Sequence, residues 1–171
     1  LQFIYTELMT LDKHSESLFR DEHIAFVFHD FNLIPILSLF ENIEYPLIMV
    51  QNWSPMKRRE RVMEMLKAVD MADQANKRPS QISGGQKQRA AVARALVTNA
   101  KLVLADEPTA NLDSASAHHV IELMKGMREK FGTTFIFSTH DPKIMAEAEV
   151  TFTLEDGRLV GQSEATEVTD V

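Results

Sequence analysis

The sequence contains no cysteine, which excludes a disulfide framework and a thiolate metal site. This usage is typical of proteins in a reducing compartment. Long hydrophobic runs are also missing. The longest uncharged stretches, such as FNLIPILSLF (residues 31–40), extend for only about ten to twelve residues, whereas a membrane-spanning helix needs about 20. The sequence therefore predicts no transmembrane segment.

An excess of basic residues is missing as well. The 171 residues include 18 Lys and Arg against 25 Asp and Glu, a formal net charge of −7 at pH 7. A positively charged surface supplies most of the affinity for nucleic acid, so this balance argues against a nucleic-acid partner. The six histidines are scattered and form no zinc-type pair with a third ligand nearby.

The apolar content is sufficient for one core. With 44% hydrophobic residues in 171, the chain fits one domain and leaves little room for two. The sequence opens with Leu1 rather than Met and runs directly into LQFIYTELMTL, without the pattern of a secretory signal. We therefore expect Leu1 to lie in the interior of a longer sequence.

Strands and helices alternate in the second half of the sequence. The segments KLVLAD (101–106), TTFIFST (133–139) and VTFTLED (150–156) are apolar and β-branched, as is typical of strands. A helix is predicted from Ser114 to Lys130, and another begins at Asp141-Pro142. This alternation predicts a parallel sheet with helical crossovers, so the fold class is α/β.

The ends of the chain contain shorter signals. FIYTEL (3–8) and HIAFVFH (23–29) are strand-like segments, expected at a sheet edge and joined by a short helical or irregular link. Asp156-Gly157 predicts a tight hairpin, and residues 162–171 are expected to form a polar tail.

The segment from Phe31 to Asn99 has a helical texture. Its clearest helix begins at Ser54, a capping residue, followed by Pro55 at the first helical position. Apolar residues then form one stripe: Val62, Met65, Leu66 and Val69. The opposite face is KRRER (57–61), which we interpret as a solvated helix face, with a docking surface as the alternative.

Two adjacent carboxylates follow an apolar strand in LVLADEPTANLD (102–113). In parallel α/β sheets, ligands gather at the carboxyl ends of strands, so Asp106 and Glu107 are expected at the edge of a site. We expect Asp106 to hold Mg²⁺ through its hydration shell, because magnesium prefers oxygen ligands and keeps its waters. Glu107 is then placed to polarise an attacking water.

A second candidate site is QISGGQKQRAAVARAL (81–96), in which Ser83, Gly84 and Gly85 precede an Ala-rich helix. Backbone amides at a helix start bind anions, because the helix dipole and the free N–H groups both point outward. A lone SGG is weak evidence, but SGGQ followed by QRAAVARAL and then by the acidic strand end is a specific combination.

Together these segments resemble the nucleotide-binding subunit of ABC transporters. ISGGQKQR (82–89) is similar to the family signature, LVLADEPTANLD to Walker B with the D-loop, and STHD (138–141) to the switch-histidine segment. FNLIP, ENIEYPL and ADEPTANLD most resemble the lipoprotein-releasing and macrolide-export type. The resemblance extends from about Phe3 to Val160.

The resemblance implies a role for each matching residue in an ATPase that uses ATP and Mg²⁺. Asp106 serves Mg²⁺, Glu107 is the catalytic base, Asp113 communicates across a dimer, and His140 contacts the γ-phosphate and water. The signature residues contact the γ-phosphate held by the opposite subunit: Ser83, Gly84, Gly85 and Gln86.

The family also implies an organisation and partners. We expect a partial P-loop NTPase-like core with an edge and Q-loop strand in 1–30, an α-helical signature subdomain in 31–99, the second half of the core in 100–161, and the tail in 162–171. A second ATPase subunit joins head to tail, and the transmembrane permease subunit contacts residues 28–46. The expected location is the cytoplasmic face of a bacterial membrane.

The sequence departs from the family in lacking the Walker A pattern G-x-x-x-x-G-K-[ST]. In this family the loop precedes the strand that FIYTEL resembles, so we expect it upstream of Leu1, in a missing front of at least about 30 residues. Without it the phosphates lose their cradle, and we expect negligible ATP hydrolysis by these 171 residues alone. We also expect exposed apolar surface on Val27, Leu104 and Phe137.

A second departure is VFHDF, where the family has Gln in place of His29. An imidazole is shorter than the Gln side chain and is not the preferred ligand of Mg²⁺, so this substitution puts the coupling of ATP to the membrane partner in doubt.

Two alternatives remain open. The chain could be a degenerate, non-hydrolysing partner that supplies only the signature half of a site. It could also be an ABC-type ATPase of DNA repair or chromosome structure, although such proteins insert long coiled coils and no sustained heptads occur here.

Overall fold

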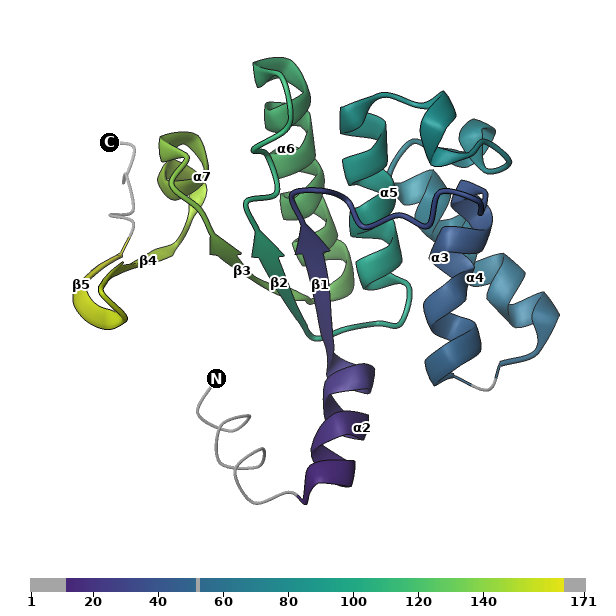
Figure 1. Cartoon of the computed structure of the whole chain (residues 1–171), viewed down its shortest axis with the longest axis horizontal. Coiled ribbons are helices and arrows are strands. Elements are labelled where there is room, and N and C mark those ends of the chain that lie inside the picture. The colour runs from purple at the N-terminus through teal and green to yellow at the C-terminus, as the bar shows by residue number, and fades with distance from the viewer. Residues whose placement is uncertain (1–11, 52, 165–171) are drawn as a thin grey trace. The chain divides into compact units, whose positions relative to one another are not determined.

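The computed structural model describes residues 12–51 and 53–164 (Figure 1). The predicted strand FIYTEL lies outside the described residues. The chain divides after Ser138 into two compact units. The elements, in chain order, are α2 (Lys13–His23), β1 (Ile24–Phe28), α3 (Leu39–Val50), α4 (Pro55–Ala68), the 3₁₀ turns Ala72–Gln74 and Pro79–Gln81, α5 (Gly84–Leu96), β2 (Leu102–Asp106), α6 (Ser114–Phe131), β3 (Thr134–Ser138), α7 (Pro142–Glu147), β4 (Val150–Glu155) and β5 (Arg158–Glu164).

The sheet of the first unit has three parallel strands in the order β1-β2-β3. Phe26 pairs with Leu104 and Leu104 pairs with Ile136, so these three residues lie side by side across the sheet. The helices α5 and α6 connect them along the chain, as expected for crossovers between parallel strands (Figure 1). The predicted α/β class is confirmed, and among the described residues β1 lies at an edge of the sheet, as predicted.

One face of this sheet is covered by helices and the other is partly exposed. The odd-numbered strand residues, among them Val27, Phe135 and Phe137, belong to or pack against the buried core. Phe26 and Ile136, on the other face, are each 41% exposed. The prediction of exposed apolar surface was therefore wrong for Val27, which is fully buried, because successive strand side chains alternate between faces and its side chain points toward the helices.

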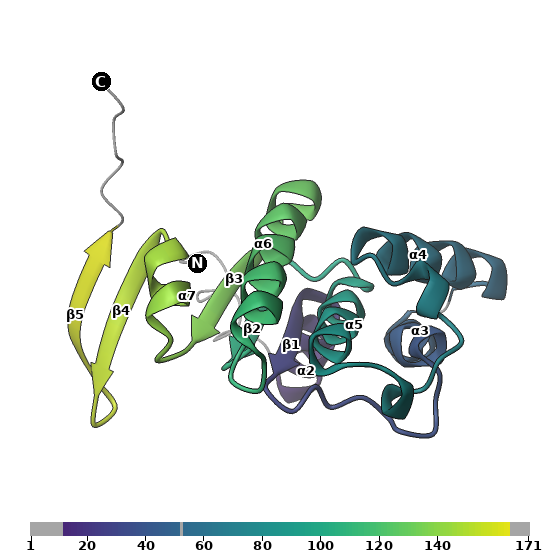
Figure 2. The same ribbon diagram turned by 90° about the horizontal axis from the view of Figure 1, so that it is seen from above.

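A helical layer adjoins β1. The helix α5 contacts β1, α3 and α4, and both views place it between β1 and α3 (Figures 1 and 2). Each helix begins at a residue whose side chain accepts a backbone N–H: Ser38 for α3, Ser54 for α4 and Ser83 for α5. The predicted start of α4 at Ser54-Pro55 is confirmed.

The second unit contains α7 and the antiparallel hairpin β4–β5. Asp156 and Gly157 both have positive φ, 48° and 74°, as the two central residues of a type I′ hairpin turn require. The predicted hairpin is therefore confirmed. The strand β5 continues to Glu164 because Val150, at the start of β4, pairs with Glu164. The first residues of the predicted polar tail thus belong to a strand.

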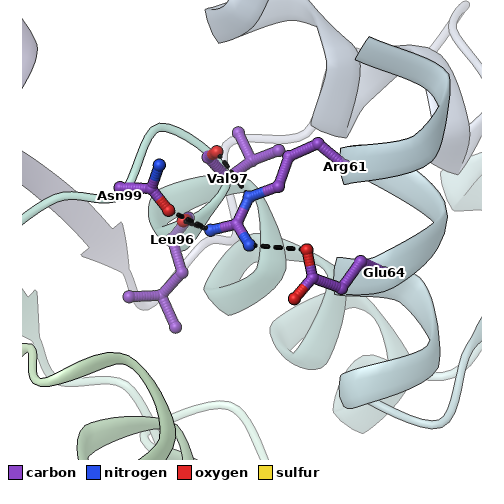
Figure 3. Close-up of polar contacts among 5 residues, drawn as sticks. All are labelled: Arg61, Glu64, Leu96, Val97 and Asn99. Carbon is purple, nitrogen blue, oxygen red and sulfur yellow. Dashed lines mark hydrogen bonds and ion pairs between the residues drawn. The ribbon is translucent and has the colours of Figure 1, made fainter. Parts of the chain in front are cut away.

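Arg61 joins α4 to the end of α5 (Figure 3). Its Nε donates to the carbonyl oxygen of Val97 at 3.1 Å, and its Nη2 donates to the carbonyl oxygen of Leu96 at 3.1 Å and to Oδ1 of Asn99. Its side chain is only 11% exposed. The prediction of a solvated KRRER face was therefore wrong for Arg61, whose guanidinium instead binds carbonyls that the end of α5 leaves without helical partners.

No helix in the two described ranges combines the length and apolarity that crossing a bilayer requires.

Replacing Arg61 with Met should destabilise the fold. The substitution keeps an apolar stem but removes the donors to the carbonyl oxygens of Val97 and Leu96, of which Leu96 still accepts the N–H of Asn99 at 3.1 Å, so we expect a loss of about 2 kcal/mol in the free energy of unfolding, measured with urea. Arg59→Met, at an exposed position of the same helix, is the matched control and should change stability by about 0.5 kcal/mol or less. Equal effects of the two substitutions would contradict this role of Arg61.

Candidate nucleotide site at the carboxyl edge of the sheet

The carboxyl ends of the three parallel strands meet at one edge. Phe28 pairs with Asp106 and Asp106 pairs with Ser138, so these three strand ends lie side by side. His29 directly follows the first strand and Glu107 directly follows the second. The parallel register therefore brings together residues that are far apart in the sequence.

His29 faces Asp106 across this edge. Its Nδ1 lies 4.0 Å from Oδ2 of Asp106, and both side chains are about half exposed, 50% and 55%. The backbone of His29 is fixed by Asn111, whose side-chain amide donates to the His29 carbonyl oxygen at 2.9 Å. The edge thus presents an accessible carboxylate oxygen beside an imidazole.

Glu107 adopts a backbone conformation that is rare for its residue type. Its φ is 44°, in the left-handed region. Hydrogen bonds on both sides hold this conformation: its N–H donates to the carbonyl oxygen of Ser138 at 2.9 Å, and its carbonyl oxygen accepts the N–H of Ala110 at 3.1 Å. Strained backbones of this kind concentrate at functional sites, where the surrounding structure supports them.

The loop after His29 is held by the helix that begins at the signature segment, residues 82–89. Phe31 and Asn32 have positive φ, 66° and 47°, and Arg94 of α5 donates to both of their carbonyl oxygens. Burial lowers the pKa of the Arg94 guanidinium, with Asp30 opposing the shift. These bonds connect α5 directly to the segment that follows the sheet edge.

A second anchor of this loop is Asn42, which is almost fully buried in α3. Its Oδ1 accepts the N–H of Ile34 at 2.7 Å, and its Nδ2 donates to the carbonyl oxygens of Ile34, Leu37 and Ser38 at 2.9 to 3.2 Å. A buried amide that satisfies both of its polar atoms fixes the backbone around it.

The signature segment begins α5 with a reciprocal cap. Oγ of Ser83 accepts the N–H of Gln86 at 3.3 Å, and Oε1 of Gln86 accepts the N–H of Ser83 at 3.0 Å. Gly84 packs on the loop before α6, where a Cβ would lie 3.5 Å from Leu112. The start of α5, with the positive end of its dipole, therefore lies against the segment that ends in Asp113.

Asp113 caps the next helix, α6. Its Oδ1 accepts the N–H groups of Ala115 and Ser116 at 3.1 and 3.0 Å, and its Oδ2 accepts the Ser116 hydroxyl at 2.6 Å. The hydroxyl bond is the main reason why the pKa of Asp113 is lowered. Its predicted role in communication across a dimer stays a prediction, beside this capping role that the structure adds.

His140 belongs to the second unit and is described with it. Two residues after the end of β3, it lies next to a turn in which the N–H of Asp141 donates to Oγ1 of Thr139 at 3.0 Å. Its predicted contact with the γ-phosphate and water stays a prediction.

The chemistry of this edge fits a magnesium ion that is shared with a bound phosphate. Within the described ranges, no three His, Cys, Asp or Glu side chains gather as a metal site. Magnesium in nucleotide sites needs few protein ligands, because it keeps waters and binds phosphate oxygens. Asp106 supplies a suitable exposed oxygen, whereas the imidazole of His29 suits other divalent metals better.

Sequence reasoning missed the residues that support this edge. They are Asn42, Arg94, Asn111 and Ser116. Arg94 is a charged residue in an Ala-rich segment and Ser116 lies three residues after Asp113, but neither pattern identifies the partner of the side chain. Asn42 binds backbone groups four to eight residues before it, and Asn111 binds a carbonyl group 82 residues before it.

Comparison with known proteins gives the family. A family model described as "ABC transporter" matches residues 6–110. The chain belongs to the ABC transporter family of ATP-binding domains. This confirms the resemblance drawn from ISGGQKQR, LVLADEPTANLD and STHD.

Individual relatives of the chain carry names from the same family. The chain is 39% identical to the ABC transporter ATP-binding protein YtrE of Bacillus subtilis, over 91% of this chain and 67% of that protein. It is 40% identical to the macrolide export ATP-binding/permease protein MacB of Burkholderia thailandensis, over 91% of this chain and 23% of that protein. It is 41% identical to MJ0796 of Methanocaldococcus jannaschii, over 87% of this chain and 65% of that protein. The chain thus spans about two thirds of the length of YtrE and of MJ0796, and under a quarter of the length of MacB.

Solved structures show the same fold. A dimeric, post-hydrolysis structure of the ATP-binding cassette MJ0796 bound to ADP and Pi superimposes with a TM-score of 0.78 at 39% identity, over 91% of this chain and 68% of that one. CbiO1 of Clostridium perfringens, part of the ABC transporter complex cbiONQ, gives a TM-score of 0.81 at 28% identity, over 90% and 61% of the two chains. The expected ABC ATPase fold is confirmed.

The cap of α6 should make part of the stability pH-dependent. Because the pKa of Asp113 is lowered in the fold, its carboxylate stabilises the protein above the usual Asp value of about 3.9 and loses this effect as pH falls through the lowered pKa. Asp113→Asn keeps a capping side chain that does not titrate. We expect this variant to lose less stability than the wild type between about pH 6 and about pH 3 in urea unfolding. Parallel curves for the two proteins would contradict the assignment.

Proposed function

We propose that this chain provides ATP-binding and ATP-hydrolysing residues for a bacterial ABC transporter, in which hydrolysis of ATP to ADP and phosphate drives transport. The observation that carries the proposal is the sheet edge, where Asp106 ends β2 and Glu107 follows it in a conformation held by Ser138. An exposed acid for the metal and a rigidly held acid for the water are what this reaction requires.

The proposed steps use groups that the chain itself presents. Asp106 offers an oxygen to hydrated Mg²⁺, which neutralises charge on the phosphates when it is bound. Glu107 orients the attacking water and accepts its proton. His140 contacts the γ-phosphate, and His29 lies at the position where the family has Gln, so its effect on coupling belongs to this proposal.

The signature segment is proposed to act on nucleotide held by a second ATPase subunit in a head-to-tail dimer. Ser83, Gly84, Gly85 and Gln86 form a helix start whose amides and dipole suit an anion. Asp113, at the start of α6, is proposed to communicate across that dimer. The dimeric structure of the similar cassette MJ0796 supports this arrangement.

A transmembrane permease subunit is the proposed second partner, with residues 28–46 as its contact. This range includes the loop after His29, where Ile36 is 76% exposed, and the α3 residue Tyr45, which is 45% exposed. Exposed apolar side chains of this kind suit a protein interface. The proposed location is the cytoplasmic face of a bacterial membrane, at its surface.

Glu107→Gln tests the proposal in the full-length protein. The amide keeps the size of the side chain but cannot accept the proton of the attacking water, so we expect turnover to fall about 10²- to 10⁴-fold while ATP affinity is retained. Phosphate release measures the first and equilibrium nucleotide binding the second. Glu122→Gln, an exposed position on α6, is the control and should leave both unchanged. Normal turnover of the Glu107 variant would refute the proposed role.

The 171 residues by themselves are proposed to hydrolyse ATP negligibly, because they contain no G-x-x-x-x-G-K-[ST] segment. The intact signature segment then favours a second candidate function, a partner that closes over ATP bound by a complete subunit. We expect the 171-residue chain to show no turnover sensitive to Glu107→Ala, measured by phosphate release. Such turnover would contradict the proposal that the 171 residues alone hydrolyse ATP negligibly. An unchanged ATPase rate after mixing with a complete homologue would contradict the partner function.

A further inference from the structure

Gly85 lies unusually close to the first turn of α6. A Cβ built at Gly85 would lie 3.0 Å from both Cβ and Oγ of Ser116, tighter than ordinary van der Waals contact. The nearest atom to a Cβ at the neighbouring Gly84 is 3.5 Å away. Gly85 is not among the glycines with positive φ, so close approach, and not backbone conformation, is what excludes a side chain here.

Ser116 cannot easily make room for such a side chain. Its hydroxyl donates to Oδ2 of Asp113 at 2.6 Å, and its own N–H donates to Oδ1 of the same residue at 3.0 Å. Its Cβ is fixed by the backbone of α6, whatever rotamer the hydroxyl adopts. A larger residue at 85 therefore has to separate the beginnings of two helices.

We propose that Ser116 is a positioning residue, whose contact with Gly85 fixes the start of α5 against the start of α6. Through this contact, the signature segment and Asp113 keep one relative position within a single subunit. This inference rests on the proposed function, because both groups are assigned there to nucleotide and to the dimer. It assigns a role to Ser116, which lies outside the signature and D-loop segments. It also explains the glycine at position 85 by a contact within one subunit.

The test is a set of compensating substitutions in the full-length protein. Gly85→Ala introduces the Cβ, Ser116→Gly removes the atoms that it would meet, and Ser116→Ala removes the hydroxyl but keeps the Cβ. Gly84→Ala is the matched control for the unfolding measurements only, because its Cβ has ordinary packing space within the subunit. Each glycine variant is made alone and combined with each Ser116 variant.

We expect Gly85→Ala to lower kcat for ATP about tenfold, with less change in KM, and to lower Tm by about 4 °C. Adding Ser116→Gly should restore Tm to the value of Ser116→Gly alone and raise kcat in part, because the Cβ at position 85 stays beside the proposed phosphate contact, whereas adding Ser116→Ala should do neither. Ser116→Gly should not improve Gly84→Ala. Rates are compared at a temperature where every variant is folded, so that a change in kcat reports positioning and not a loss of folded protein.

Two results would overturn the inference. If Gly85→Ala lowers Tm as much in the Ser116→Gly background as in the wild type, the glycine is required by something other than Ser116. If Ser116→Ala rescues equally well, the Cβ contact does not set the spacing. The unfolding measurements need no nucleotide, so compensation in Tm without any ATPase activity of the wild type would count against the proposed function while supporting the contact.

Discussion

Parallel pairing of β1, β2 and β3 in one register brings the acidic pair and its neighbours to a single edge. Strand side chains alternate with a period of two, so a slip of one residue would turn Asp106 toward the helices and an alanine toward the edge. The buried odd-numbered residues of β2 oppose such a slip, because it would also expose Val103 and Ala105. The chemistry of the edge therefore depends on packing beneath the sheet.

Much of the fold could be predicted from the sequence because local patterns determine it. Ser54-Pro55 marks the start of α4, Asp156-Gly157 marks the hairpin, and alternating apolar segments mark the strands. The covered face of the sheet and the burial of Arg61 could not be predicted in this way. Both depend on which distant segment packs against a residue, and the period of a strand or helix does not contain that information.

The candidate site likewise contains residues that the sequence predicts and residues that it does not. The acids and the glycine pair are recognisable because short segments place them at a strand end and a helix start. The residues that hold these segments are ordinary polar side chains, such as Asn42 and Asn111, bound to backbone carbonyl groups. Asn42 binds groups four to eight residues before it and Asn111 binds one 82 residues before it, and no regular sequence spacing identifies either set of partners.

The contacts of Arg61 with the end of α5 have a mechanical consequence. This helix has 13 residues and is about 20 Å long, with Ser83 at one end and the carbonyl groups bound by Arg61 near the other. For a rod of that length, a tilt of about 5° about one end displaces the other end by about 2 Å, more than the range of distances over which a hydrogen bond forms. The position of the signature segment therefore depends on contacts at both ends of α5, with Arg61 at its last carbonyl groups and with α6 at its start.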